Sequence, residues 1–71
     1  MDEKDLKNRF AYHAPKEGQP EKYEILRACG FILAEEINHL CPDSREKSLA
    51  VTRVEEAVMW ANASIARNEK E

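Results

Sequence analysis

The fold is decided by the stretch Leu40-Cys41-Pro42-Asp43-Ser44-Arg45-Glu46, in which one helix ends and another begins within a few residues. Pro42 has no backbone N–H and cannot continue a helix that reaches it from the N-terminal side. Asp43 is a favoured N-cap residue, and Glu46 lies three residues later, where it can complete a capping box. A connection this short joins two neighbouring antiparallel helices. The stretch therefore predicts a helical hairpin whose second helix is capped by Asp43.

Apolar residues recur at helical spacing on both sides of this turn, from Glu21 to about Leu40 and from about Ser44 to Arg67. Gly30 interrupts the first pattern, either to let a second backbone or a ligand come close or as a tolerated surface glycine. Both patterns predict amphipathic helices that pack on each other through their apolar faces. The first face is Leu26, Cys29, Leu33, Ile37 and Leu40, and the second is Val51, Val54, Val58, Ala61 and Ile65.

The second long helix has a further face that the hairpin cannot cover. It consists of small, basic and aromatic residues, namely Ala50, Arg53, Ala57, Trp60, Ser64 and Arg67. A helix with two such faces needs two partners. A monomer would leave Trp60, Phe31, Met59 and Ile32 largely in water, so we expect a homo-oligomer with cyclic or dihedral symmetry. The alternative is a monomeric three-helix bundle that uses residues 2–10 as its third helix.

The two ends of the chain are expected to be peripheral. Residues 2–9 predict a short helix with acidic residues early and basic residues late, as the helix dipole favours. Two prolines and a glycine from Pro15 to Pro20 predict a loop, and Pro20 suits the first position of the next helix. The fold class is therefore all-α, with residues 1–71 as a single helical-hairpin domain, a core at 8–67 and a frayed tail at 68–71.

Composition narrows the classes of function. A chain of 71 residues makes one small core, which usually needs a staple or a partner subunit. The net charge of −3 disfavours a helix-turn-helix DNA-binding protein, because such proteins carry a basic face. No apolar run is long enough to span a membrane, and the charged start lacks the apolar region of a signal peptide. We therefore expect a cytoplasmic protein that binds neither DNA nor membrane.

The reactive side chains form no catalytic or metal-binding pattern. Cys29 and Cys41 lie 12 residues apart in a predicted helix, which separates them by about 18 Å and prevents a disulfide. Only His39 lies near Cys41, which is too few ligands for a metal site. Neither His13 nor His39 has a nucleophile at helical spacing, and no glycine-rich phosphate loop is present. We expect neither enzymatic activity nor a cofactor.

A binding site for an anion remains as a candidate. Arginine pairs well with phosphate, and aromatic rings stack on nucleobases. In the stretch Arg9-Phe10-Ala11-Tyr12-His13, three rings stand beside a basic residue. From the residues alone, packing of Phe10 and Tyr12 onto the hairpin is the favoured interpretation. A helical protein–protein interaction module that uses Trp60 and Met59 is a further alternative.

Three stretches are specific in combination: RFAYHAP at residues 9–15, CPDSREKSLA at 41–50 and EEAVMWANASIAR at 55–67. Together they resemble the phage anti-CBASS cyclic-nucleotide sponge family, which has the Acb/Tad hairpin domain. CBASS is a bacterial antiphage system that signals through cyclic oligonucleotides. The resemblance covers about residues 8–67. It implies a compact homohexamer of helical hairpins that binds its ligands between subunits in the host bacterial cytoplasm.

The resemblance also implies a mechanism, since members of this family sequester their ligands without cleaving them and so prevent effector activation. The ligands are cyclic dinucleotides such as 3',3'-cyclic GMP-AMP and, in some members, cyclic trinucleotides at separate sites. On this sequence, the resemblance implies that Tyr12 stacks on a base, that Arg27 meets phosphate and that Arg67 belongs to a trinucleotide site. His13, Pro15 and Lys22 are further ligand-binding candidates.

Overall fold

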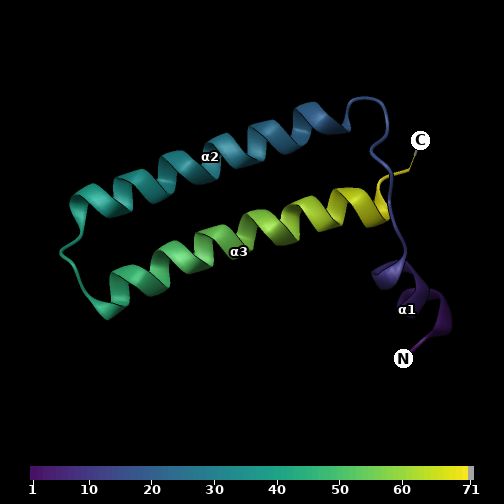
Figure 1. The fold of residues 1–71 in the computed structure, drawn as a ribbon, viewed down its shortest axis with the longest axis horizontal. Helices are drawn as coiled ribbons and strands as arrows, with labels where there is room; N and C mark the ends of the chain where they lie inside the picture. Colours follow the sequence, from purple (N-terminus) through teal and green to yellow (C-terminus); the bar gives the residue numbers. More distant parts are fainter. Residues whose placement is uncertain (71) are drawn as a thin grey trace.

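The structure is a computed structural model that describes residues 1–70. This part of the chain contains three helices, α1 (Glu3–Phe10), α2 (Gln19–Leu40) and α3 (Arg45–Asn68), and no strand. Helices α2 and α3 lie antiparallel side by side, and α1 lies beyond the open end of this hairpin, near the end of α3 (Figure 1). The fold is therefore the predicted all-α hairpin with a short N-terminal helix.

The turn between α2 and α3 is held by Ser44, and the predicted N-cap role of Asp43 is wrong. Ser44 has an extended backbone, and its Oγ accepts a hydrogen bond from the backbone N–H of Lys47 at 3.1 Å. Lys47 is then the third helical residue, so Glu46 cannot complete the predicted capping box. The carboxylate of Asp43 instead accepts a hydrogen bond from Nζ of Lys47 at 2.9 Å. Helix α2 ends at Leu40, as the proline predicted.

The seam between α2 and α3 uses smaller residues of α2 than the sequence predicted. Gly30 faces α3, because a Cβ added to it would lie 2.5 Å from Cγ2 of Val58. The helices therefore approach closely at Gly30, and this packing leaves Cys29, Leu33 and Leu40 of the predicted α2 face exposed. The half-buried residues of α2 are Tyr23, Leu26, Gly30, Ala34 and Ile37, and the α3 face is half-buried as predicted, at Val51, Val54, Val58, Ala61 and Ile65.

No hydrophobic side chain is buried in the described part of the chain. Phe31, Met59 and Trp60 remain 66%, 64% and 63% exposed. The Cα atoms extend over 44 × 30 × 14 Å with a radius of gyration of 15.3 Å, whereas a compact domain of this length has about 11 Å. Within residues 1–70, extensive helix packing is confined to α2 and α3, so the alternative of a monomeric three-helix bundle is wrong.

The open end of the hairpin is joined by polar contacts around Gln19, the single buried residue among those described. Its Oε1 accepts a hydrogen bond from the backbone N–H of Lys16 at 2.9 Å. Its Nε2 donates to Oε1 of Glu69 at 3.0 Å and to the carbonyl of Ile65 at 3.4 Å. Lys22 forms an ion pair with the same Glu69 carboxylate. These contacts tie the start of α2 to the end of α3.

Two residues of the predicted tail at 68–71 take part in the described structure. Asn68 is the last residue of α3, and Glu69 is held by Gln19 and Lys22. Hydrogen bonds from Lys22 and then from Gln19 lower the pKa of the Glu69 carboxyl. The described chain is thus anchored through Glu69, and Glu71 lies outside the described residues.

Candidate ligand-binding site

Tyr12, the candidate for base stacking, lies in the loop of residues 11–18 between α1 and α2. Its side chain is 86% exposed, and that of Phe10 is 83% exposed. The favoured interpretation from the residues alone, packing of both rings onto the hairpin, is therefore wrong for the single chain. An exposed ring is free to stack on a base, which typically contributes about 1–3 kcal/mol.

His13 and Pro15 lie in the same loop as Tyr12, but the His13 ring already has a partner. Its Nε2 lies 2.8 Å from the backbone carbonyl oxygen of Asn8. That carbonyl belongs to the last turn of α1, where carbonyl groups have no partner within the helix. A carbonyl oxygen can only accept, so Nε2 of His13 carries the hydrogen and donates it. Pro15 is exposed.

Lys22 lies in the first turns of α2, and the structure gives its charge a partner on the same chain. Its Nζ pairs with the carboxylate of Glu69, while its side chain stays 53% exposed. A phosphate that approached Lys22 would therefore compete with Glu69. Among the six candidate residues, Lys22 is the one whose charge is already offset by an ion pair within residues 1–70.

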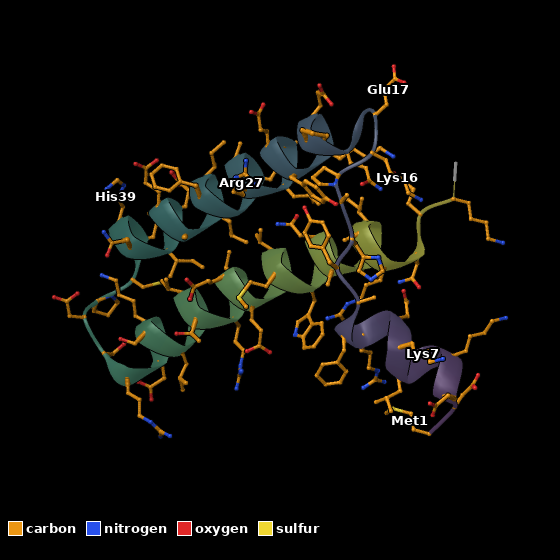
Figure 2. The ribbon with its side chains drawn as sticks, turned by 45° about the vertical axis from the view of Figure 1, so that its right-hand side comes forward. Met1, Lys7, Lys16, Glu17, Arg27 and His39 are labelled. Carbon is orange, nitrogen blue, oxygen red and sulfur yellow. The ribbon has the colours of Figure 1, made fainter. Side chains whose placement is uncertain are left out.

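Arg27 projects from the middle of α2 (Figure 2) and lines an open cleft of about 570 Å³ beside the hairpin seam. No ion pair within residues 1–70 involves its guanidinium. The same cleft is lined by Phe31, Met59 and Asn62, and Oδ1 of Asn62 is buried there without a hydrogen-bond partner in the described chain. A buried acceptor without a partner is unfavourable. The cleft thus combines the cation of Arg27, the ring of Phe31 and the carboxylate of Glu55.

Arg67 lies near the end of α3 and lines a different cleft, of about 660 Å³, between α3 and α1. Trp60 of α3 and Phe10 of α1 line the same cleft. Arg9, also in this cleft, pairs with Asp5 at 3.3 Å, whereas no ion pair of Arg67 occurs within residues 1–70. A half-buried guanidinium beside two aromatic rings suits a planar anionic ligand.

The single chain does not bring all six candidates into one cavity. Tyr12, His13 and Pro15 share the loop of residues 11–18, while Arg27 and Arg67 line separate clefts. Tyr12 lines neither of these two clefts. Any site that combines Tyr12 with either arginine therefore needs a rearrangement or a second copy of the chain.

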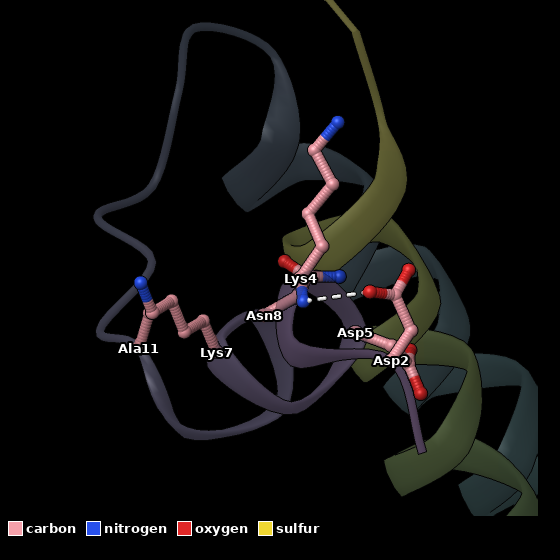
Figure 3. Close-up of a pocket in the computed structure, with 6 residues that line it drawn as sticks. All are labelled: Asp2, Lys4, Asp5, Lys7, Asn8 and Ala11. Atoms are coloured by element: carbon pink, nitrogen blue, oxygen red, sulfur yellow. Dashed lines mark hydrogen bonds between the residues drawn. The ribbon is translucent and has the colours of Figure 1, made fainter.

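A further hollow lies on α1 and contains none of the six candidates. Figure 3 shows its lining residues and the hydrogen bond of 3.2 Å that the backbone N–H of Lys4 donates to Oδ1 of Asp2. This contact is the N-cap of α1, so the hollow is a feature of one short helix. Within residues 1–70, no group of three or more histidines, cysteines and acidic residues is arranged for a metal ion. No helix of this part is long and apolar enough to cross a membrane.

Sequence reasoning missed Gln19, Glu69 and Asn62. The partners of Gln19 on α3 lie 46 and 50 residues away, so no local pattern could have indicated them. Asn62 occurs in the resembling stretch at residues 55–67, which was the available signal. Its burial depends on the register of the two long helices.

The family model described as "Acb2/Tad1, hairpin domain" matches residues 1–66. The chain belongs to the Acb2/Tad1 hairpin family. This result confirms the resemblance found in the three stretches. The Acb2/Tad1 hairpin is a binding and sequestering domain, and membership suggests an anti-defence sponge for cyclic nucleotides. Searches among curated proteins and among solved structures gave no match.

Proposed function

We propose that this protein is a phage anti-defence protein that binds cyclic oligonucleotide second messengers and holds them intact in the host bacterial cytoplasm. CBASS effectors then fail to receive their signal. The observation that carries the proposal is the match of the Acb2/Tad1 hairpin domain over residues 1–66. The ligands proposed are cyclic dinucleotides such as 3',3'-cyclic GMP-AMP, with cyclic trinucleotides at a second kind of site.

The chemistry of the exposed side chains supports this proposal. A cyclic dinucleotide presents two bases and two phosphate charges, which match aromatic rings and guanidinium groups. Tyr12 offers an exposed ring, and Arg27 and Arg67 line two separate clefts. Two separate clefts, each lined by one of these arginines, also fit two classes of cyclic ligand. The net charge of −3 keeps the rest of the surface unattractive to longer nucleic acids.

Self-association is part of the proposal, with the homohexamer of the family as the expected state. The chain exposes 5965 Å², whereas a compact monomer of 8.2 kDa exposes about 4,500 Å². Large apolar side chains are among the exposed residues, such as Phe31, Met59 and Trp60. A neighbouring copy would cover these side chains and bring its own Tyr12 close to Arg27. Gel filtration with light scattering tests this, and a mass near 8.2 kDa would contradict it.

Titration calorimetry with 3',3'-cyclic GMP-AMP tests the binding function. We expect saturable heat, whereas no heat at high micromolar ligand would contradict the proposal. Tyr12→Ala should weaken binding about 5- to 150-fold, and Tyr12→Phe should retain it, because the phenylalanine ring still stacks. Arg27→Gln should weaken binding, while the matched variant Arg45→Gln, at the far turn of the hairpin, should bind as the wild type. Recovery of intact ligand after heat denaturation would separate sequestration from hydrolysis.

A second candidate is a helical module that binds another protein. The exposure of Met59 and Trp60 on α3 favours it. The variant Trp60→Ala distinguishes the two roles. If it stays assembled, keeps its cyclic nucleotide and loses a protein partner, Trp60 is a docking residue. If the variant dissociates into single chains, Trp60 belongs to the interface between copies.

A further inference from the structure

The loop that carries Tyr12 is fastened at both of its ends by side-chain hydrogen bonds. At one end, Nε2 of His13 donates to the carbonyl of Asn8 at 2.8 Å. At the other end, Oε1 of Gln19 accepts from the backbone N–H of Lys16 at 2.9 Å. The two anchors fix the loop to α1 and to the open end of the hairpin.

The hydrogen bond of His13 to α1 gives His13 and the neighbouring Tyr12 different roles. His13 is half-buried with its ring turned back to the last turn of α1, whereas Tyr12 is 86% exposed. Ala11 leaves α1 with extended backbone angles, φ −76° and ψ 150°. The ring of His13 is thus held against α1, while that of Tyr12 stays in solvent.

The anchor at Gln19 gives the loop a fixed position relative to the long helices. Gln19 is 1% exposed and bonds to Ile65 and Glu69 of the α3 end as well as to Lys16 of the loop. Gly18 precedes it with φ 83°, a left-handed conformation that glycine adopts without strain. The chain thus reverses at Gly18 and is locked immediately afterwards.

We propose that His13 and Gln19 are positioning residues that hold the loop carrying Tyr12 in its binding geometry before the ligand arrives. The proposal rests on the proposed function and assigns His13 an action through Tyr12 in place of direct contact with the ligand. A loop ordered in advance loses less conformational entropy on binding, which strengthens affinity without a new contact.

Affinity for 3',3'-cyclic GMP-AMP tests the proposal in three variants. His13→Leu and Gln19→Met remove the anchoring hydrogen bonds at similar volume, and each should weaken binding about three- to tenfold. His13→Gln should restore near wild-type affinity, because the glutamine amide nitrogen can reach the carbonyl that Nε2 reaches. Circular dichroism and light scattering should show unchanged helix content and assembly. If Gln19→Met fails to fold, His13→Leu carries the test, because His13 lies outside both long helices.

Backbone order parameters of the ligand-free protein provide the second measurement. Residues 12–16 should have values near those of rigid backbone in the wild type and in His13→Gln, and lower values in His13→Leu. Weaker binding by His13→Leu with unchanged order would show direct ligand contact and overturn the proposal. Wild-type affinity in His13→Leu would overturn it as well. If the wild type itself binds no cyclic nucleotide, the proposed function fails, and the positioning role fails with it.

Discussion

The turn of the hairpin is held by contacts between residues close in sequence, and its open end by contacts between residues far apart in sequence. At the turn, Ser44 and Asp43 bond to Lys47, three and four residues away. At the open end, Gln19, Lys22 and Lys16 bond to the end of α3 across 46 to 53 residues. The turn is therefore built from neighbours in sequence, whereas the open end exists only when both long helices are formed and in register.

This difference assigns different tasks to the two ends. Local contacts close small loops, so the entropy of closing the turn is modest and the turn can form early. The contacts of Gln19 need both long helices in place, and they also fix the end of the loop that carries Tyr12. The turn thus specifies the topology, and the open end couples correct helix packing to the geometry of the candidate site.

Removing the side chain of Gln19, which joins the open end of the hairpin, should have the largest effect on stability. Gln19→Ala leaves the backbone N–H of Lys16 and the carbonyl of Ile65 without these partners, and we expect a loss of about 3 kcal/mol in the free energy of unfolding. Urea denaturation at fixed protein concentration measures it, because self-association also adds stability. Glu17→Ala is the matched control, since Glu17 points away from the hairpin (Figure 2) and should change stability by less than about 0.5 kcal/mol. Equal curves for both variants would refute the importance of the open end.

A side chain added at Gly30, where α2 and α3 approach closely midway along the hairpin, should have the next largest effect on stability. In Gly30→Ala the new Cβ would lie 2.5 Å from Cγ2 of Val58, whose β-branched side chain has few alternative rotamers. Overpacking should exceed the gain in helix propensity and destabilise the hairpin by about 1.5 kcal/mol. Thermal unfolding of Gly30→Ala and of Gly30→Ala with Val58→Ala measures the effect. Failure of the second substitution to recover stability would show that the clash is elsewhere.

At the turn, removing the N-cap should have a smaller effect. Ser44→Ala removes the acceptor for the Lys47 N–H, and we expect a loss of about 1 kcal/mol. Asp43→Ala tests the cap predicted from sequence and should affect stability less, because its partner contact is an exposed ion pair. Urea midpoints of the two variants compare them directly. A larger effect for Asp43→Ala would restore Asp43 as the functional cap.

Acid should weaken both ends slightly, through one carboxylate at each. Lys47 lowers the pKa of Asp43, and Lys22 followed by Gln19 lowers the pKa of Glu69. A carboxyl whose pKa is lower in the folded chain stabilises it above the unfolded pKa. For Glu69 that stabilisation should be lost as pH falls from 4.5 through its lower folded pKa. Urea midpoints across this range should fall less in Glu69→Gln than in the wild type, and parallel profiles would contradict the assignment.

The structural features that were predicted correctly from the sequence are those that depend on residues close together in the chain. Helical spacing indicated α2 and α3, Pro42 marked the turn, and the α3 face from Val51 to Ile65 was confirmed. The cap was displaced by one residue because Asp43 and Ser44 are both good caps, and only backbone geometry decides between them. Boundaries of helices shift for the same reason, as at Gln19, which places Pro20 second in α2.

The remaining features depend on contacts between distant residues. The predicted α2 face included Leu33, but Gly30 lets the helices approach, so the exposed Leu33 lies off the seam. The spacing of apolar residues locates hydrophobic side chains. It cannot reveal a close contact between helices that a glycine permits because it has no side chain. The roles of Tyr12, Arg27 and Arg67 remain predictions, since they depend on a ligand and on neighbouring copies.

The thinness of the chain, 14 Å along its shortest axis, has an evolutionary consequence. Almost every side chain lies on one of two broad faces or along the seam, so there is little interior to constrain the faces. Substitutions on a face can change the exposed surface while the Gly30–Val58 seam preserves the hairpin. A chain of this shape can thus vary its two faces and keep one scaffold.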